Sequence, residues 1–97
     1  MSFIIKFSDK ALSELAEASA WYDETQIGLG ERFEYDIFKK IDLIKNNPLH
    51  YQKRKRFHEA PADAFPYLIV YQIEKKQHMI TILSVFHTSR HPKKKFR

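Results

Sequence analysis

Positively charged residues and histidines, the side chains best suited to bind or act on a polyanion, are concentrated in the second half of the sequence. Residues 1–47 hold nine acidic residues and six Lys or Arg, whereas residues 48–97 hold three acidic residues and eleven Lys or Arg. All five histidines also lie in the second half. This distribution favours a polyanion or an acidic protein as partner, because opposite charges attract at long range. The alternative is a solvated basic face that serves only solubility.

The densest group of positive charges is the run Lys53, Arg54, Lys55 and Arg56, which lies beside histidines and aromatic residues. Such cations can pair with phosphates while neighbouring rings stack on bases. If the run is extended, alternate side chains point to opposite faces, so about two of the four line one groove. The alternative is an edge strand whose charges discourage pairing with other chains.

A second basic group ends the chain. The last eight residues include Arg90, Lys93, Lys94 and Lys95, and they are too short and too polar to fold alone. They predict an arm that contacts a target or an acidic protein. A frayed chain end without a partner is the alternative.

His87 lies just before this arm, at the end of the last expected strand. An imidazole at that place can act as a general base, and a histidine that only hydrogen-bonds the backbone is the alternative. In a regular strand, His87 shares a face with Leu83 and Val85. His91 follows four residues later, but no His-Glu-x-x-His pattern exists and carboxylates are scarce here, so we expect no metal site.

Several function classes are excluded by composition. The absence of Cys excludes disulfides, thiolate metal sites and cysteine nucleophiles. Gly28 and Gly30 are the only glycines, which excludes Gly-rich phosphate-binding loops, and no cofactor is expected. No apolar run approaches the ~20 residues of a membrane span, and the first residues lack a long apolar stretch. We therefore expect a cytoplasmic protein without a membrane partner.

The elements that must position these residues begin with a strand over residues 3–7 and two helices. Ser8 or Asp9 can cap the first helix, and Gly28-Leu29-Gly30 separates it from a second helix over residues 31–46. Apolar and small residues at three- and four-residue steps predict the buried faces. In the first helix these are Leu12, Leu15, Ala16, Ser19 and Tyr22, and in the second Phe33, Ile37, Ile41 and Ile44.

The second half predicts a sheet. Residues 56–59 form a possible short strand and residues 60–64 a loop, while residues 67–73 and 79–86 are long β-branched runs joined by a turn at 75–77. The order is β-α-α-β-β-β, which is an α+β fold. A helical hairpin packs on one face of a small, mainly antiparallel sheet. The last strand is a candidate partner for the first, and the sequence leaves this pairing open. The length predicts a single domain over residues 1–97.

Motifs with characteristic spacing run along nearly the whole chain. They are Ser8, Ala11, Leu15, Trp21-Tyr22, Gly28-Leu29-Gly30, Phe33, Asn47-Pro48, Phe65-Pro66-Tyr67, Tyr71, Val85-Phe86-His87 and Arg90-His91-Pro92. In this order they resemble the RelE/ParE superfamily of bacterial toxins from type II toxin–antitoxin modules. The resemblance implies a RelE/ParE-like fold and a plasmid stabilisation-type toxin whose partner is a cognate acidic antitoxin. An acidic antitoxin would suit the basic half of this chain.

The resemblance also implies one of two targets. RelE-like members cut messenger RNA on the ribosome, whereas ParE-like members inhibit DNA gyrase and are not known as nucleases. The ending His87…Arg90-His91-Pro92 looks more like the ParE-like branch, which favours a non-catalytic gyrase inhibitor. Its target- or antitoxin-binding residues would be Lys53, Arg54, Lys55, Arg56, Arg90, Lys93, Lys94 and Lys95. The sequence leaves open whether the chain forms a homodimer.

The alternative is a ribosome-dependent mRNA endonuclease. RelE-like nucleases carry Arg residues where Leu68 and Thr88 stand here, and many use a C-terminal Tyr, whereas no Tyr follows Tyr71. If the chain nonetheless cuts RNA, the catalytic set would be His87 as base with Arg90 or Arg56 as phosphate clamp. A second alternative is an inactive family member or a binding module.

Overall fold

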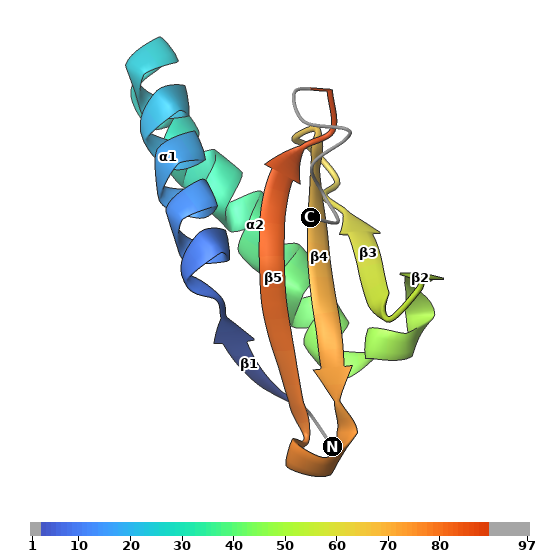
Figure 1. Cartoon of the computed structure of the whole chain (residues 1–97). Helices are drawn as coiled ribbons and strands as arrows, with labels where there is room; N and C mark the ends of the chain where they lie inside the picture. Colours follow the sequence, from blue (N-terminus) through green and yellow to red (C-terminus); the bar gives the residue numbers. More distant parts are fainter. Residues whose placement is uncertain (1–2, 90–97) are drawn as a thin grey trace.

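The computed structural model describes residues 3–89, which form two long helices beside one sheet (Figure 1). The segments are, in chain order, β1 Ile4–Phe7, α1 Asp9–Thr25, α2 Leu29–Asn46, the short 3-10 helix η1 Pro48–His50, β2 Gln52–Arg54, β3 Phe57–Pro61, β4 Tyr67–Glu74, the 3-10 helix η2 Lys75–Gln77, and β5 Met79–His87. The expected arm with Arg90, Lys93, Lys94 and Lys95 lies outside the described residues.

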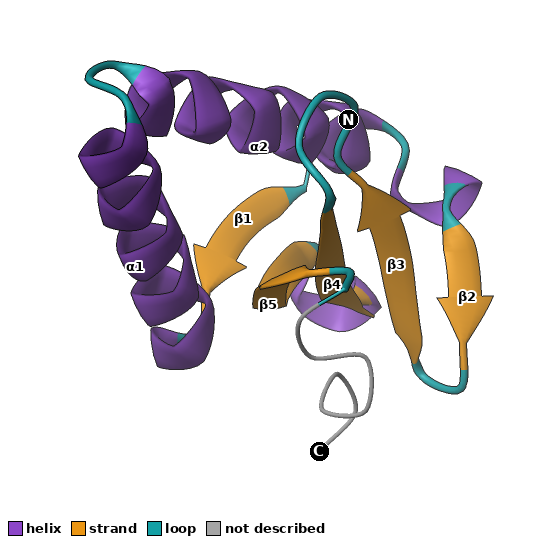
Figure 2. Cartoon of the chain, turned by 90° about the horizontal axis from the view of Figure 1, so that it is seen from above, coloured by secondary structure: helices purple, strands orange, loops and turns teal. Residues whose placement is uncertain are grey.

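Five strands form the sheet in the order β1-β5-β4-β3-β2 within the described part of the chain. β1 is parallel to β5, the partner that the sequence left open, and every other neighbouring pair is antiparallel. Figure 2 shows α2 running along one side of the sheet and α1 standing at its β1 end. This arrangement confirms the α+β fold with a helical hairpin over a mainly antiparallel sheet.

The first helix begins where Ser8 joins it to β5. The Ser8 hydroxyl accepts a hydrogen bond from the Ala11 amide at 3.0 Å and donates one to the Leu83 carbonyl at 3.0 Å. The buried stripe of α1 therefore starts at Ala11 rather than at Leu12, which is 49% exposed. Its members are Ala11, Leu15, Ser19 and Tyr22, so the expectation that Leu12 and Ala16 are buried is wrong.

The two helices approach closely at Gly30. A Cβ atom there would collide with the Ser19 carbonyl oxygen and lie 2.8 Å from the Asp23 carboxyl carbon. The Gly30 amide donates to Asp23 Oδ1 at 2.9 Å, which fixes the start of α2 against the end of α1. Gly28 caps α2 with a φ of 90°, a conformation that favours glycine.

The core lies between the helices and the face of the sheet that they cover. The predicted stripe of α2 is confirmed, because Phe33, Ile37, Ile41 and Ile44 are all buried. They pack against inward-facing residues of β4 and β5, namely Tyr67, Ile69, Tyr71, Ile80, Ile82 and Val85. This contact explains why each of these inward positions is apolar.

Two local features differ from the expectations. The short strand extends over Phe57–Pro61, so Ala60 and Pro61 belong to β3 rather than to a loop. β2 is the edge strand that the sequence offered as the alternative for the Lys-Arg run, but it extends over Gln52–Arg54, so Lys55 and Arg56 lie outside it. The Lys-Arg run is thus part of a hairpin at the edge of the sheet.

A bulge in β5 changes which residues share a face. Val70 is opposite Ser84 but Tyr71 is opposite Ile82, so Leu83 has no partner in β4. The inward positions pass from Ile82 to Val85 across the bulge. His87 therefore shares a face with Val85 but not with Leu83, which corrects the expectation for a regular strand.

Candidate functional site

The four cations of the run 53–56 lie around the end of the β2–β3 hairpin, not along one groove. Lys53 and Arg54 belong to β2, while Lys55 and Arg56 form the turn, where Lys55 adopts a φ of 58°. All four residues are exposed. Exposed cations on the outermost strand can meet a negative surface without first being desolvated.

His87 lies at the other end of the sheet, in a groove between α1 and β5. The groove has a volume of about 340 Å³. Its described lining is Glu14, Glu17, Ala18 and Trp21 from α1, with Tyr67, Val85, Phe86 and His87 from the sheet. It therefore combines two carboxylates, one imidazole and aromatic surface, and none of these described residues is Lys or Arg.

Glu14 attaches α1 to β5. β1 ends at Phe7, opposite Ile82, so the edge of β5 beyond that point has no neighbouring strand. The carboxylate Oε1 of Glu14 accepts from the Ser84 hydroxyl at 2.8 Å and from the Val85 amide at 2.9 Å. These bonds satisfy backbone that β1 does not reach, and they hold the groove's acidic wall in place.

His87 is oriented by its own backbone and by a ring. Its Nδ1 accepts a hydrogen bond from the Ser89 amide at 3.1 Å, so a neutral ring carries its proton on Nε2. The imidazole also meets the Tyr67 ring edge-on, with centroids 5.3 Å apart. This hydrogen bond to the backbone is the structural role that the sequence offers as the alternative to a general base.

The predicted catalytic residues are not brought together within the described part of the chain. β3 and β5 run in the same direction, so the turn before β3 and the end of β5 lie at opposite ends of the sheet (Figure 1). His58 is opposite Tyr71, four positions along β4 from Tyr67, the partner of His87. That separation is about 13 Å along the strand, and Arg56 lies further away. Arg90 is outside the described residues.

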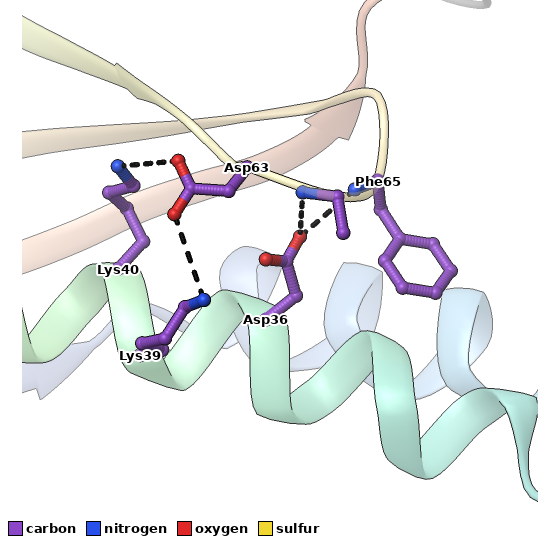
Figure 3. Close-up of polar contacts among 6 residues, drawn as sticks. Asp36, Lys39, Lys40, Asp63 and Phe65 are labelled. Atoms are coloured by element: carbon purple, nitrogen blue, oxygen red, sulfur yellow. Dashed lines mark hydrogen bonds and ion pairs between the residues drawn. The ribbon is translucent and has the colours of Figure 1, made fainter.

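A buried acid positions the loop before β4, as Figure 3 shows. Asp36 of α2 is only 3% exposed, and its Oδ2 accepts from the amides of Ala64 and Phe65, each at 3.0 Å. Lys40 Nζ lies 3.1 Å from Asp63 Oδ1 in the same loop. The anchored Phe65 ring packs edge-on against Phe33. This anchor fixes where β4 starts, and with it one wall of the His87 groove.

Sequence reasoning missed both Asp36 and Glu14. A signal exists for Asp36, because it falls between Phe33 and Ile37 on the predicted apolar stripe, where a carboxylate needs a buried partner. Glu14 carries no such signal, since it looks like any other acid on the outer side of an amphipathic helix.

Tyr71 is a structural residue rather than a reactive one. It is fully buried, and its hydroxyl donates to the Pro48 carbonyl at 2.5 Å. Burial, with a smaller contribution from Tyr51, raises the pKa of the Tyr71 phenol well above its ordinary value. The bond to Pro48 attaches η1, and so the start of β2, to the core.

Residues 3–89 contain no cluster of three or more His, Asp or Glu placed to hold a metal ion. Among the helices that the structure describes, none is both long enough and apolar enough to cross a membrane.

Comparison with known proteins gives one family. The family model described as the ParE toxin of the type II toxin–antitoxin system parDE matches residues 5–92. A search among curated proteins finds no match.

Solved structures share the fold at low sequence identity. The chromosomal ParDE system from P. aeruginosa matches with a TM-score of 0.73 and 14% identity, covering 89% of this chain and 96% of that one. The intact E. coli RelBE toxin–antitoxin complex matches with a TM-score of 0.71 and 18% identity, covering 92% and 100%. The RelBE2 complex from Mycobacterium tuberculosis matches with a TM-score of 0.64 and 17% identity, covering 90% and 99%.

Proposed function

Because the chain belongs to the ParE toxin family of type II toxin–antitoxin systems, we propose that it stops growth by binding DNA gyrase without cutting RNA, and that a cognate acidic antitoxin neutralises it. The toxin role follows from the family. The target and the absence of catalysis are the parts that need an argument from the residues.

The observation that carries the proposal is the charge of the groove around His87. A scissile phosphate beside this imidazole would meet the carboxylates of Glu14 and Glu17. RNA cleavage requires cations close to the phosphate, where they stabilise the charge that develops in the transition state. The described lining supplies negative charge instead, which opposes the approach of a phosphate.

The strand positions near the groove support the same conclusion. Leu68 and Thr88 occupy the places at which the resemblance to RelE-like nucleases calls for Arg. Leu68 follows Tyr67 in β4, and the Thr88 amide donates to the Pro66 carbonyl at 2.9 Å, so both residues lie near the His87 end of the sheet. Neither side chain can carry the positive charge that a phosphate needs.

The basic hairpin is the surface that we propose for the protein partner. Its cations are exposed at the sheet edge, with Lys53 and Arg54 in β2 and Lys55 and Arg56 in the turn. An acidic surface on gyrase or on the antitoxin would complement them. If both partners use this hairpin, their binding is mutually exclusive, and the antitoxin neutralises the toxin by occupying it.

The experiment is a supercoiling assay with purified gyrase and relaxed plasmid. The wild-type chain is expected to inhibit supercoiling, and Lys53→Glu with Lys55→Glu is expected to raise the concentration needed about tenfold. The matched control is Lys75→Glu with Lys76→Glu, which reverses two exposed charges at the η2 turn and should leave inhibition unchanged. Full supercoiling in the presence of the wild-type chain would overturn the proposal.

A further inference from the structure

The groove around His87 has a lining that suits a cation. Glu14 and Glu17 lie three residues apart on α1, so their carboxylates are on the same wall of the groove. None of the described lining residues is Lys or Arg. The negative charge that opposes a phosphate at this place attracts a positively charged group instead.

These two carboxylates form no ion pair with another residue in the described part of the chain. Glu14 Oε1 accepts from the Ser84 hydroxyl at 2.8 Å and from the Val85 amide at 2.9 Å, which fixes this carboxylate in the groove. Glu17 lies exposed on the next turn of α1. A cation that enters the groove therefore displaces no described lysine or arginine from either carboxylate.

An aromatic ring lies next to the negative charge. Trp21 follows Glu17 by four residues, so its indole is adjacent to that carboxylate on the surface of α1. The Trp21 residue is 48% exposed, and the Tyr22 ring meets the indole edge-on with centroids 5.0 Å apart. Trp is the strongest aromatic partner for a cation, because the face of its ring carries negative electrostatic potential.

Arginine fits this combination better than lysine does. Its planar guanidinium stacks on an aromatic face and donates two parallel hydrogen bonds to a carboxylate, whereas the lysine ammonium is a compact point charge. The volume of the groove, about 340 Å³, lies near the lower end of the range for ligand pockets, which suits one side chain rather than a helix.

The charges at the two ends of the sheet indicate which partner supplies the arginine. Membership of the ParE toxin family implies one protein partner, the antitoxin. Acidic residues of an antitoxin complement the exposed β2–β3 hairpin, but the groove repels them. An antitoxin segment that reaches the His87 end must therefore present a positive charge there.

We propose that the cognate antitoxin inserts one arginine side chain into this groove, with its guanidinium on the Trp21 ring and against the Glu17 carboxylate. The contact fixes the direction of the antitoxin on the toxin, because the hairpin accepts acidic residues and the groove accepts a basic one. The inference rests on the proposed neutralisation by an acidic antitoxin and not on the gyrase target, so its tests contain no gyrase.

The full-length toxin alone tests the groove. Trp21 is the only tryptophan of the chain, so its indole N–H gives a single cross-peak in the NMR spectrum of the ¹⁵N-labelled protein. N-acetyl-arginine methylamide should shift this peak in a saturable way. The citrulline analogue, which has a similar shape without the charge, should bind about tenfold more weakly, and the lysine analogue should also bind more weakly. Equal shifts with the arginine and citrulline compounds would overturn the proposal.

Conservative substitutions locate the charge that binds the probe. Glu17→Gln keeps the shape of the side chain and should abolish the preference for the arginine compound over the citrulline compound. The matched control is Glu24→Gln, which removes another exposed carboxylate of α1 outside the described lining and should bind like wild type. A preference that survives Glu17→Gln, or one that Glu24→Gln also abolishes, would contradict the assignment.

A charge exchange in the toxin–antitoxin complex identifies the partner. Glu17→Arg is expected to weaken antitoxin binding about tenfold, and replacing one particular antitoxin arginine by glutamate should restore most of the loss. Failure of every antitoxin arginine to give this restoration would overturn the inference. A shift of the Trp21 peak that grows with toxin concentration, without antitoxin, would assign the groove to a second copy of the chain and would overturn it as well.

Discussion

The two ends of the sheet are built in opposite ways. The His87 end is held by hydrogen bonds from α1 and by packed aromatic rings, and its groove is acidic. The β2–β3 hairpin at the other end is short, exposed and basic. The groove at the His87 end carries the wrong charge for a phosphate, whereas the basic end carries the right charge on an exposed hairpin. Under the proposed function, the basic end binds the protein partner and the His87 end carries out no catalysis.

The largest expected effect is a loss of stability at the His87 end of the sheet. Asp36→Ala leaves the amides of Ala64 and Phe65 without their acceptor, so we expect a loss of about 2–4 kcal/mol in the free energy of unfolding. Asp36→Asn keeps an acceptor oxygen and should recover most of this loss. Urea unfolding of both variants measures the difference, and equal stability of Asp36→Ala and wild type would contradict the anchor.

The next effect concerns the basic end. Lys53→Glu with Lys55→Glu should weaken binding of the cognate antitoxin about tenfold at low salt and reduce its salt dependence, because exposed ion pairs are screened. Stability should change little. Calorimetric titration at two salt concentrations measures both quantities. An unchanged salt dependence would show that the hairpin does not contact the antitoxin.

A smaller effect is expected at Tyr71, between the two ends. Tyr71→Phe removes the bond to Pro48 and should destabilise the fold by about 1 kcal/mol at neutral pH. The pKa of Tyr71 is raised in the folded state, so its contribution is complete below the unfolded value of about 10 and is lost as the pH rises above it. Wild type should therefore lose stability faster than Tyr71→Phe above pH 10. Parallel curves would contradict this assignment.

The smallest effect is expected at His87 itself. His87→Ala should leave growth arrest within about twofold of wild type, because the proposed function includes no proton transfer by the imidazole. A general base would contribute about 10²–10⁴-fold to the rate. Dose–response curves of growth against inducer distinguish the two cases, and rescue of growth by His87→Ala would favour the nuclease alternative.

Much of the fold follows from periodic burial. The stripe Phe33, Ile37, Ile41 and Ile44 and the apolar runs of β4 and β5 carried enough signal to predict α2 and the central strands. β2 could be offered only as an alternative, on its charges, because a polar edge strand has no apolar period. The face of His87 was predicted only in part, because a bulge at Leu83 depends on backbone pairing that side-chain types do not encode.

The candidate site was harder to predict than the fold. The basic run is visible in the sequence, but its placement around a turn depends on the left-handed conformation of Lys55, which no glycine or asparagine indicates. Glu14, on the acidic wall of the groove, was missed because it can bond to β5 only beyond the end of β1. That end is Phe7, one residue before Ser8, the N-cap of α1. Such long-range contacts arise from topology rather than from local sequence.

The topology of plasmid DNA after induction of the toxin tests the central claim most directly. Gyrase inhibition predicts that a reporter plasmid loses negative supercoils as growth stops, and that co-expression of the antitoxin restores both. A plasmid that keeps its full supercoiling while growth stops would contradict the account.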